Sequence, residues 1–171
     1  MQDATESLRL ADKYDLATAE AELVNVVDHW TELCDQTTVA TGDEAFDPML
    51  NYWLKYQTVA GRMVGRCAYF QQGGAFGYRD QLQDSLALLP LAPERTKKQL
   101  RIQAEAMYED GSVRHWWHPN TQIFAESRHC DTCLWLAHGV LAYLDETNDL
   151  RALGEECSFL SHESQLAGQA G

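Results

Sequence analysis

Apolar positions along most of the chain recur at steps of three and four residues, the spacing of one face of an α-helix. The polar stretch from Thr37 to Asp43 interrupts this pattern, and Asp15 stands before the first periodic segment as its expected N-cap. We therefore predict a leading helix and linker within residues 1–45. The apolar face of that helix comprises Leu16, Ala19, Leu23, Val26, Trp30 and Leu33.

A second periodic segment follows Asp47-Pro48, where Asp is the expected N-cap and Pro the first helical residue. Gly73 and Gly74 end it, so the pattern predicts a helix of about six turns. Its apolar stripe comprises Met49, Trp53, Tyr56, Ala60, Met63, Cys67 and Phe70.

Three further helices are predicted, from about Asp80 to Pro90, from Pro93 to Gly111, and from Asp131 to about Thr147. No segment alternates convincingly as a strand would. The fold class is therefore all-α, built from antiparallel helix pairs. The two long connections, 71–79 and 109–130, fall at the same end of such pairs and lead into helix N-termini, so we expect the functional site there.

Composition narrows the function classes. The 171 residues, 45% of them hydrophobic, suffice for one domain with a buried core. A formal net charge of −13 argues against general binding to nucleic acid or anionic membranes. Basic residues are scarce, which draws attention to those near the polar loops: Arg62, Arg66, Arg79, Arg114 and Arg128.

The cysteines and the N-terminus bear on the compartment. Five scattered cysteines in an acidic chain do not resemble a disulfide framework, and no run of about 18 apolar residues predicts a membrane span. The polar, acidic N-terminus also differs from a secretory signal. We therefore expect a reducing, cytoplasmic environment.

The stretch GGAFGYRDQLQD, residues 73–84, carries the first candidate site. Asp80 and Asp84 lie one helical turn apart, with Arg79 and Gln83 beside them. One interpretation is structural: acidic residues in the first turn of a helix interact favourably with the helix dipole, which explains Asp80. It explains Gln83, Asp84 and the preceding glycine-rich aromatic loop poorly. Carboxylates and amides beside aromatic rings suit sugar hydroxyls.

The loop VRHWWHP is the second candidate, with two tryptophans between His115 and His118. Trp116 and Trp117 could anchor the loop against the core or form a wall of a sugar-binding cleft. These alternatives remain open at the sequence level.

Asp131 is the third candidate, where the loop gives way to an apolar helix. It could be an ordinary N-cap, or an acid whose pKa burial raises and which protonates a leaving group. A zinc alternative uses His115, His118, Cys130 and Cys133, although their order matches no common zinc finger and a single CxxC is a weak signal. We expect no bound metal.

Four segments together resemble glycoside hydrolase family 94, which includes cellobiose and chitobiose phosphorylases. These are NYWLKYQ, QQGGAFGYRDQLQD, the HWWHP run and LWLAHGVLAYLDETND, and the resemblance spans roughly residues 46–159. The HWWHP form is most similar to the phosphorylase-like domain of cyclic β-1,2-glucan synthases. The resemblance implies that residues 46–171 form part of an (α/α)6 toroid.

The family also implies an activity. In inverting phosphorolysis of a β-linked glucoside, inorganic phosphate is the co-substrate and attacks the anomeric carbon while one Asp protonates the leaving oxygen. Its sugar-binding Arg and Asp correspond to Arg79 and Asp84, and Arg66 is a candidate phosphate ligand. Its acid falls either at Asp131, which could then protonate the leaving group, or at position 132, where Thr132 could not and the chain would be inactive. No other cofactor is implied, and the expected partner is a β-glucan oligosaccharide.

Two departures qualify the resemblance. Where the family usually has Asp-Asp, this chain has Asp131-Thr132, so that one carboxylate is lost. Family members run to several hundred residues, and the 171 residues do not reach the family's phosphate-binding His and Thr. The alternative is a non-catalytic glucan-binding or self-associating helical module, either as a homo-oligomer or against the remainder of a longer enzyme.

Overall fold

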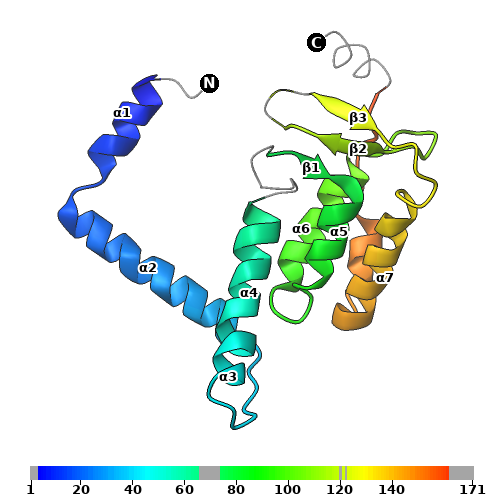
Figure 1. Cartoon of the computed structure of the whole chain (residues 1–171). Helices are drawn as coiled ribbons and strands as arrows, with labels where there is room; N and C mark the ends of the chain where they lie inside the picture. Colours follow the sequence, from blue (N-terminus) through cyan, green and yellow to red (C-terminus); the bar gives the residue numbers. More distant parts are fainter. Residues whose placement is uncertain (1–3, 66–73, 120, 122, 162–171) are drawn as a thin grey trace.

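Three helices and a small sheet form the best-packed part of the computed structural model, which describes residues 4–65, 74–119, 121 and 123–161. Helices α5 (Tyr78–Leu86), α6 (Pro93–Ala104) and α7 (Leu134–Thr147) pack against one another, and the sheet lies at one end of them (Figure 1). The predicted helices beginning near residues 80, 93 and 131 are thus present. The second of them ends earlier than expected, at Ala104.

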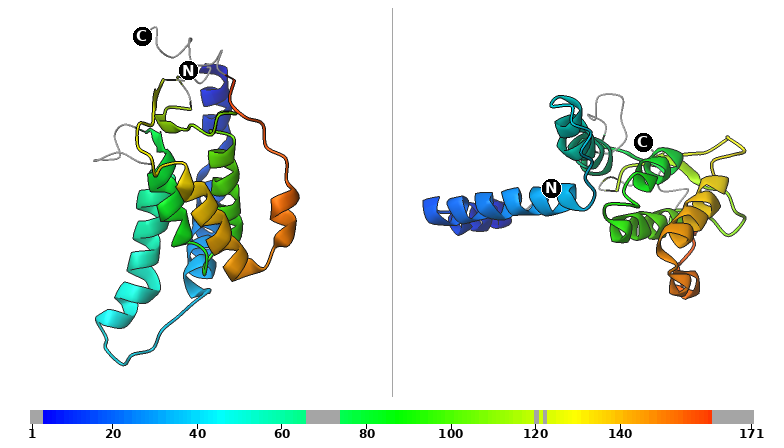
Figure 2. Two further views of the ribbon diagram at one scale, coloured as in Figure 1. Left: turned by 90° about the vertical axis from the view of Figure 1, so that its right-hand side faces the viewer. Right: turned by 90° about the horizontal axis from the view of Figure 1, so that it is seen from below.

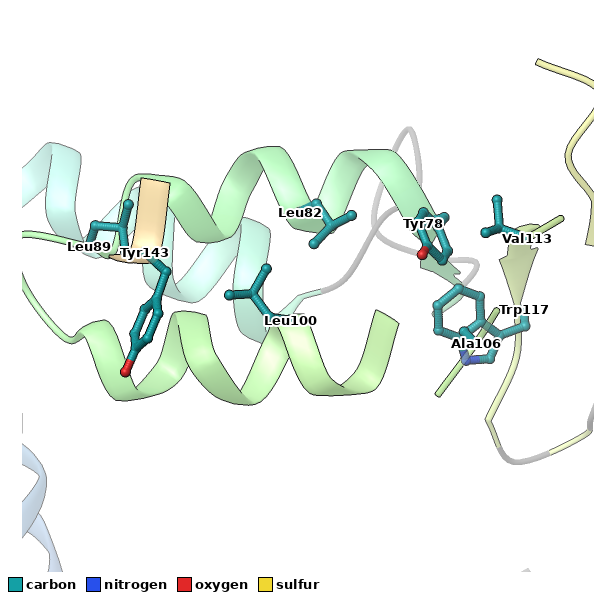
Figure 3. Close-up of a cluster of buried hydrophobic side chains, with 8 residues drawn as sticks. All are labelled: Tyr78, Leu82, Leu89, Leu100, Ala106, Val113, Trp117 and Tyr143. Atoms are coloured by element: carbon teal, nitrogen blue, oxygen red, sulfur yellow. The ribbon is translucent and has the colours of Figure 1, made fainter. Parts of the chain in front are cut away.

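The main core lies between α5, α6, α7 and the sheet (Figure 3). Leu82 of α5 and Leu100 of α6 meet in its centre, and Tyr78 connects this layer to the strands. Gly139 of α7 permits a close approach, because a Cβ atom there would lie 2.8 Å from Cδ2 of Leu100. Helix α7 ends at Asn148, whose left-handed backbone (φ 54°) confirms the predicted end of this helix.

The sheet is antiparallel, with strand order β1-β2-β3: β1 is Phe76–Gly77, β2 is Arg114–Trp117 and β3 is Phe124–Glu126. It corrects the expectation that the chain has no strand. At two to four residues each, these strands are too short to produce a recognisable alternation of apolar and polar positions.

The sheet also joins the two long connections. Phe76 pairs with Trp117 and Gly77 with Trp116, so the glycine-rich loop and the HWWHP loop are neighbouring strands at the N-terminal end of α5. The prediction that both loops meet at one end of the helices is therefore confirmed.

The N-terminal helices extend away from this body (Figures 1 and 2). Helix α2 (Leu16–Asp35) begins where predicted, and the Asp15 carboxylate accepts a 2.7 Å hydrogen bond from the Thr18 backbone N–H. Helix α1 (Ala4–Lys13) was not predicted. Only the C-terminal end of α2 is buried, at Leu33 and Cys34.

The second predicted helix is a rod of mixed type. It comprises α3 (Phe46–Pro48), the π-helical η1 (Met49–Trp53), α4 (Leu54–Tyr56) and the π-helical η2 (Gln57–Val64). The continuation predicted towards Phe70 and Gly73 lies outside the described residues.

The start of this rod corrects one capping prediction. Asp43, rather than Asp47, accepts hydrogen bonds from the first backbone N–H groups, those of Ala45 and Phe46. Asp47 instead binds the backbone N–H and the hydroxyl of Thr41. The pattern therefore identified a helix start correctly, but Asp47 is not its N-cap; the N-cap residue is Ala45.

Much of the apolar face of the rod stays exposed. Together with α2 it lines an apolar groove of about 530 Å³. The groove is lined by Val26, Val27, Trp30, Thr31, Cys34, Pro48, Tyr52, Trp53 and Tyr56. Within the described part of the chain, no helix is both long and apolar enough to cross a bilayer.

Candidate functional site

An ion pair connects two of the three sequence candidates. Arg79 lies in the first turn of α5 and Asp131 in the turn that precedes α7, and Nη1 of Arg79 is 3.2 Å from Oδ2 of Asp131. Both side chains are about half exposed, at 44% and 50%. The two charged groups therefore face solvent together at the sheet end of the helices.

Asp131 does not have the environment expected of a buried acid. Burial raises its pKa, but hydrogen bonds to the carboxylate, chiefly from Arg79 and also from the Trp135 side chain, outweigh this and lower the pKa below the usual range. The carboxylate also borders an open hollow of about 340 Å³ with Leu134, Trp135 and His138. Of the two alternatives for Asp131, the one in which burial raises its pKa is therefore not supported by the structure.

The carboxyl group with a raised pKa is Asp84. Burial raises the pKa of Asp84, whose side chain is only 16% exposed, and the nearby Asp80 adds to the rise, while the Arg62 guanidinium opposes it. Nε of Arg62, from η2, lies 2.9 Å from Oδ2 of Asp84. Sequence reasoning marked Arg62 only as one of few cations near the polar loops, because spacing cannot show which carboxylate it meets.

Asp80 and Gln83 are exposed on the same helix. With 100° between successive residues, Arg79 and Asp84 lie about 140° apart around α5, and the other two fall between them. The motif therefore presents a continuous polar surface. Its two ends are held by ion pairs, one towards α7 and one towards η2.

The HWWHP residues divide between the core and the surface. Trp117 is 8% exposed and stacks on Phe76 at 5.6 Å between ring centroids, so it belongs to the core and not to a cleft wall. Trp116 is half-buried and meets His118 edge to face. His115 is exposed, and its ring lies 5.2 Å from that of His129.

Thr132, where family 94 usually has a second acid, points into the protein. Its side chain is 2% exposed, and its hydroxyl accepts a 2.9 Å hydrogen bond from the Ser127 hydroxyl. Of the two neighbouring positions, Asp131 is therefore the one on the exposed polar surface.

The remaining candidate ligands, for phosphate and for zinc, are Arg66 and four His and Cys residues. Arg66, the proposed phosphate ligand, lies outside the described residues. The zinc candidates His115, His118, Cys130 and Cys133 are described, and no metal-binding group of three or more His, Cys, Asp or Glu side chains occurs among the described residues. The zinc alternative therefore gains no support from the structure.

Comparison with known families decides the assignment. Residues 29–165 match the model of the glycosyl hydrolase 94 superfamily, catalytic domain. The chain belongs to this superfamily. The matched region contains the Arg79–Asp131 and Arg62–Asp84 ion pairs and the sheet. It also contains the three candidate segments, at residues 73–84, 113–119 and 131.

Individual relatives agree with this assignment. The chain is 37% identical over 140 residues to the cyclic beta-(1,2)-glucan synthase NdvB of Rhizobium meliloti, covering 82% of this chain and 5% of that protein. It is 27% identical to the N,N'-diacetylchitobiose phosphorylase of Vibrio furnissii, covering 86% of this chain and 22% of that enzyme. The identity to the solabiose phosphorylase of Paenibacillus borealis is 30%, covering 82% and 17% respectively.

The chain thus corresponds to a segment of a phosphorylase-type catalytic domain and spans less than a quarter of the length of these relatives. It is mostly helical, as expected for a family of (α/α)6 toroids, with the small sheet added at the site.

Proposed function

We propose that these residues form the sugar-binding part of an inverting glycoside phosphorylase acting on β-linked glucosides or glucans, with inorganic phosphate as co-substrate. The observation that carries the proposal is the Arg79–Asp131 ion pair, which joins the segment 73–84 to the proposed acid within the region that matches the superfamily. On this proposal Arg79, Asp80, Gln83 and Asp84 bind sugar hydroxyls. His115, Trp116 and His118 flank them.

Asp131 is the proposed general acid. Phosphate would attack the anomeric carbon, the glycosidic C–O bond would break, and the proton of Asp131 would pass to the leaving oxygen. Because Arg79 lowers the pKa of Asp131, this role requires the ion pair to open. A sugar hydroxyl that engages the Arg79 guanidinium would open it, and the hollow beside Asp131 would then leave the acid in less polar surroundings.

Binding is the first test. Titration with β-1,2-linked glucan oligosaccharides, followed by calorimetry and by tryptophan fluorescence, is expected to give saturable binding that Arg79→Ala abolishes. Lys98→Ala is a matched control, since Lys98 is an exposed cation in the middle of α6 and not one of the candidate site residues. Equal binding by both variants, or none by the unaltered chain, contradicts the proposal.

Turnover is the second test. Glucose 1-phosphate is assayed after incubation with the same oligosaccharides and phosphate, both for this chain and for a chain extended to the length of its relatives. We expect turnover to need the longer chain, because phosphate contacts beyond these residues complete the site. Asp131→Asn should abolish that turnover while leaving sugar binding within a few fold.

A second candidate function is a non-catalytic module that associates with a second copy of itself. The apolar groove between α2 and the rod favours it, because exposed apolar surface of this extent is costly in a monomer. Light scattering should then detect a dimer that Trp53→Ser dissociates. A monomer at all concentrations excludes this candidate.

A further inference from the structure

Two free cysteines bracket the proposed acid. Cys130 and Cys133 enclose Asp131 and Thr132 in the turn that leads into α7, and Cys133 is the N-cap residue of that helix. We propose that Cys130 and Cys133 are a redox-active dithiol pair that closes a disulfide across this turn. The proposal concerns the thiols themselves and does not depend on which sugar the chain binds.

Cys130 and Cys133 lie in one continuous run of turns, which covers residues 130–133. The Leu134 N–H donates to the Asp131 carbonyl at 3.0 Å and the Trp135 N–H donates to the Thr132 carbonyl at 3.4 Å, so two overlapping four-residue turns begin directly after Cys130. A disulfide needs Cα atoms about 4.4–6.8 Å apart, and a separation of two residues within such a run of turns is compatible with that distance.

The side chain of Cys133 is directed back along the turn. Its Sγ lies 4.0 Å from the backbone carbonyl oxygen of Cys130, as a weak S–H···O contact. The turn is also held in place from inside the protein, because the buried Thr132 hydroxyl accepts the hydrogen bond from Ser127. The turn that carries both thiols is therefore anchored to the body of the protein.

The two thiols differ in access, as a thiol–disulfide exchange pair requires. Cys130 is exposed, whereas Cys133 is half-buried and packs against the core cluster. An external disulfide can reach Cys130 first, and Cys133 is then placed to resolve the adduct. Cys34, by contrast, is buried.

The chemistry balances with a small disulfide such as oxidised glutathione as oxidant. The Cys130 thiolate attacks one glutathione sulfur and releases the other glutathione as a thiolate, which leaves a mixed disulfide. The Cys133 thiolate then attacks Sγ of Cys130 and releases the second glutathione. Two protein thiols are oxidised, one glutathione disulfide is reduced to two thiols, and the two protons are taken up by the released thiolates.

Closure would restrain Asp131, because this residue lies within the ring that the disulfide forms. The Asp131 carboxylate lies 3.2 Å from Nη1 of Arg79 and is half exposed. A covalent link between the residues on either side of the Asp131–Thr132 pair limits the directions the carboxylate can take. The redox state of the pair would thereby act on the geometry of the candidate site.

Peptide mapping tests the disulfide directly. After equilibration with glutathione buffers, acid quenching and alkylation, trypsin cleaves after Arg128 and Arg151, so both cysteines fall on peptide 129–151 with no other cysteine. We expect this peptide to lose two hydrogen atoms and to escape alkylation under oxidising conditions. In Cys133→Ser the same treatment should leave a glutathione adduct on Cys130.

Cys157→Ser is the control and should leave the oxidised peptide unchanged. Doubly alkylated peptide 129–151 under conditions that oxidise other cysteines overturns the proposal, as does a cross-link from Cys130 or Cys133 to Cys157. The link to Asp131 has its own readout, the carboxyl ¹³C resonance of that residue. This resonance should differ between the reduced and the oxidised unaltered protein. In Cys130→Ser it should be the same under reducing and oxidising conditions. An unchanged resonance in the unaltered protein would show that the disulfide does not act on Asp131.

Discussion

Arg79 and Asp131, 52 residues apart in the chain, meet through an ion pair of 3.2 Å between Nη1 and Oδ2. One is the first charged residue of α5 and the other lies just before α7. The contact therefore does more than hold two helices together. It also lowers the pKa of Asp131, which favours the ionised form of this carboxyl group.

The first prediction concerns the pKa of Asp131. In Arg79→Ala the hydrogen bond and charge that lower this pKa are lost, so the pKa should rise. Carboxyl ¹³C shifts followed through a pH titration measure it. Arg62→Ala is the control and should leave Asp131 unaffected; equal shifts in both variants would show that the pair has no specific effect.

The second prediction concerns Asp84 and Arg62. Because Arg62 opposes the rise in the pKa of Asp84, Arg62→Ala should raise that pKa further. The variant should lose about 1–3 kcal/mol of unfolding free energy at neutral pH, where a buried carboxylate is left without its cation. A carboxyl group whose pKa is raised in the folded state costs stability only when it is ionised. The stability lost in Arg62→Ala should therefore shrink as the pH falls towards about 4, the pKa of the carboxyl group in the unfolded chain.

Urea unfolding at several pH values measures the effect. Arg62→Lys keeps the charge and should recover part of the loss at neutral pH. A loss independent of pH would assign the role of Arg62 to packing instead.

The third prediction separates Trp117 from Trp116. Trp117 stacks on Phe76 within the core, so Trp117→Ala should cost about 3–5 kcal/mol of unfolding free energy. Trp116→Ala should cost less, since this ring is only half-buried, and should weaken glucan binding. Chemical denaturation and calorimetric titration measure the two effects; similar stability losses would mean that both rings belong to the core.

Sequence reasoning could recover the elements that depend on local signals. The Asp15 cap, the Pro93 start and the Asn148 stop each rest on the chemistry of one or two residues, and all three are present. The meeting of the two long loops followed from the alternating directions of successive helices.

What the sequence could not supply depends on distant contacts. The direction of Trp117 into the core depends on its pairing with Phe76. The pKa values of Asp84 and Asp131 depend on burial first, and then on arginines 22 and 52 residues away in the sequence. Periodicity also predicted a buried stripe along the rod, yet Trp53 remains 55% exposed. An apolar pattern shows which face tends to be buried, but not what covers it.

The fourth prediction concerns the approach of α7 to α6. A Cβ at Gly139 would lie 2.8 Å from Cδ2 of the buried Leu100, so Gly139→Val should overpack the contact and cost about 1–3 kcal/mol. Gly154→Val is the matched control, because nothing lies within 4 Å of a Cβ there. Thermal unfolding of both variants measures the difference, and equal melting temperatures would show that Leu100 yields freely.

The last prediction uses the ion pairs that join α6 to the segment after α7. Nζ of Lys97 lies 2.9 Å from Oδ2 of Asp149 and 2.7 Å from Oε1 of Glu155, and the Tyr143 hydroxyl donates to the same Asp149 oxygen at 3.0 Å. Lys97 first, and then Tyr143, lower the pKa of Asp149. Its contribution to stability is therefore present above the unfolded pKa of about 3.9 and is lost as the pH falls through the lower folded value.

Lys97→Met should remove most of this dependence, so that the unfolding free energies of the variant and the unaltered protein converge as the pH falls below about 4. Lys98→Met is the control, since Lys98 is an exposed neighbour on the same helix, and its curve should run parallel to that of the unaltered protein. Urea titrations from neutral to acidic pH test both. If the gap between Lys97→Met and the unaltered protein stays constant through the acidic range, Lys97 stabilises the chain by packing of its methylene groups and not through the Asp149 carboxylate.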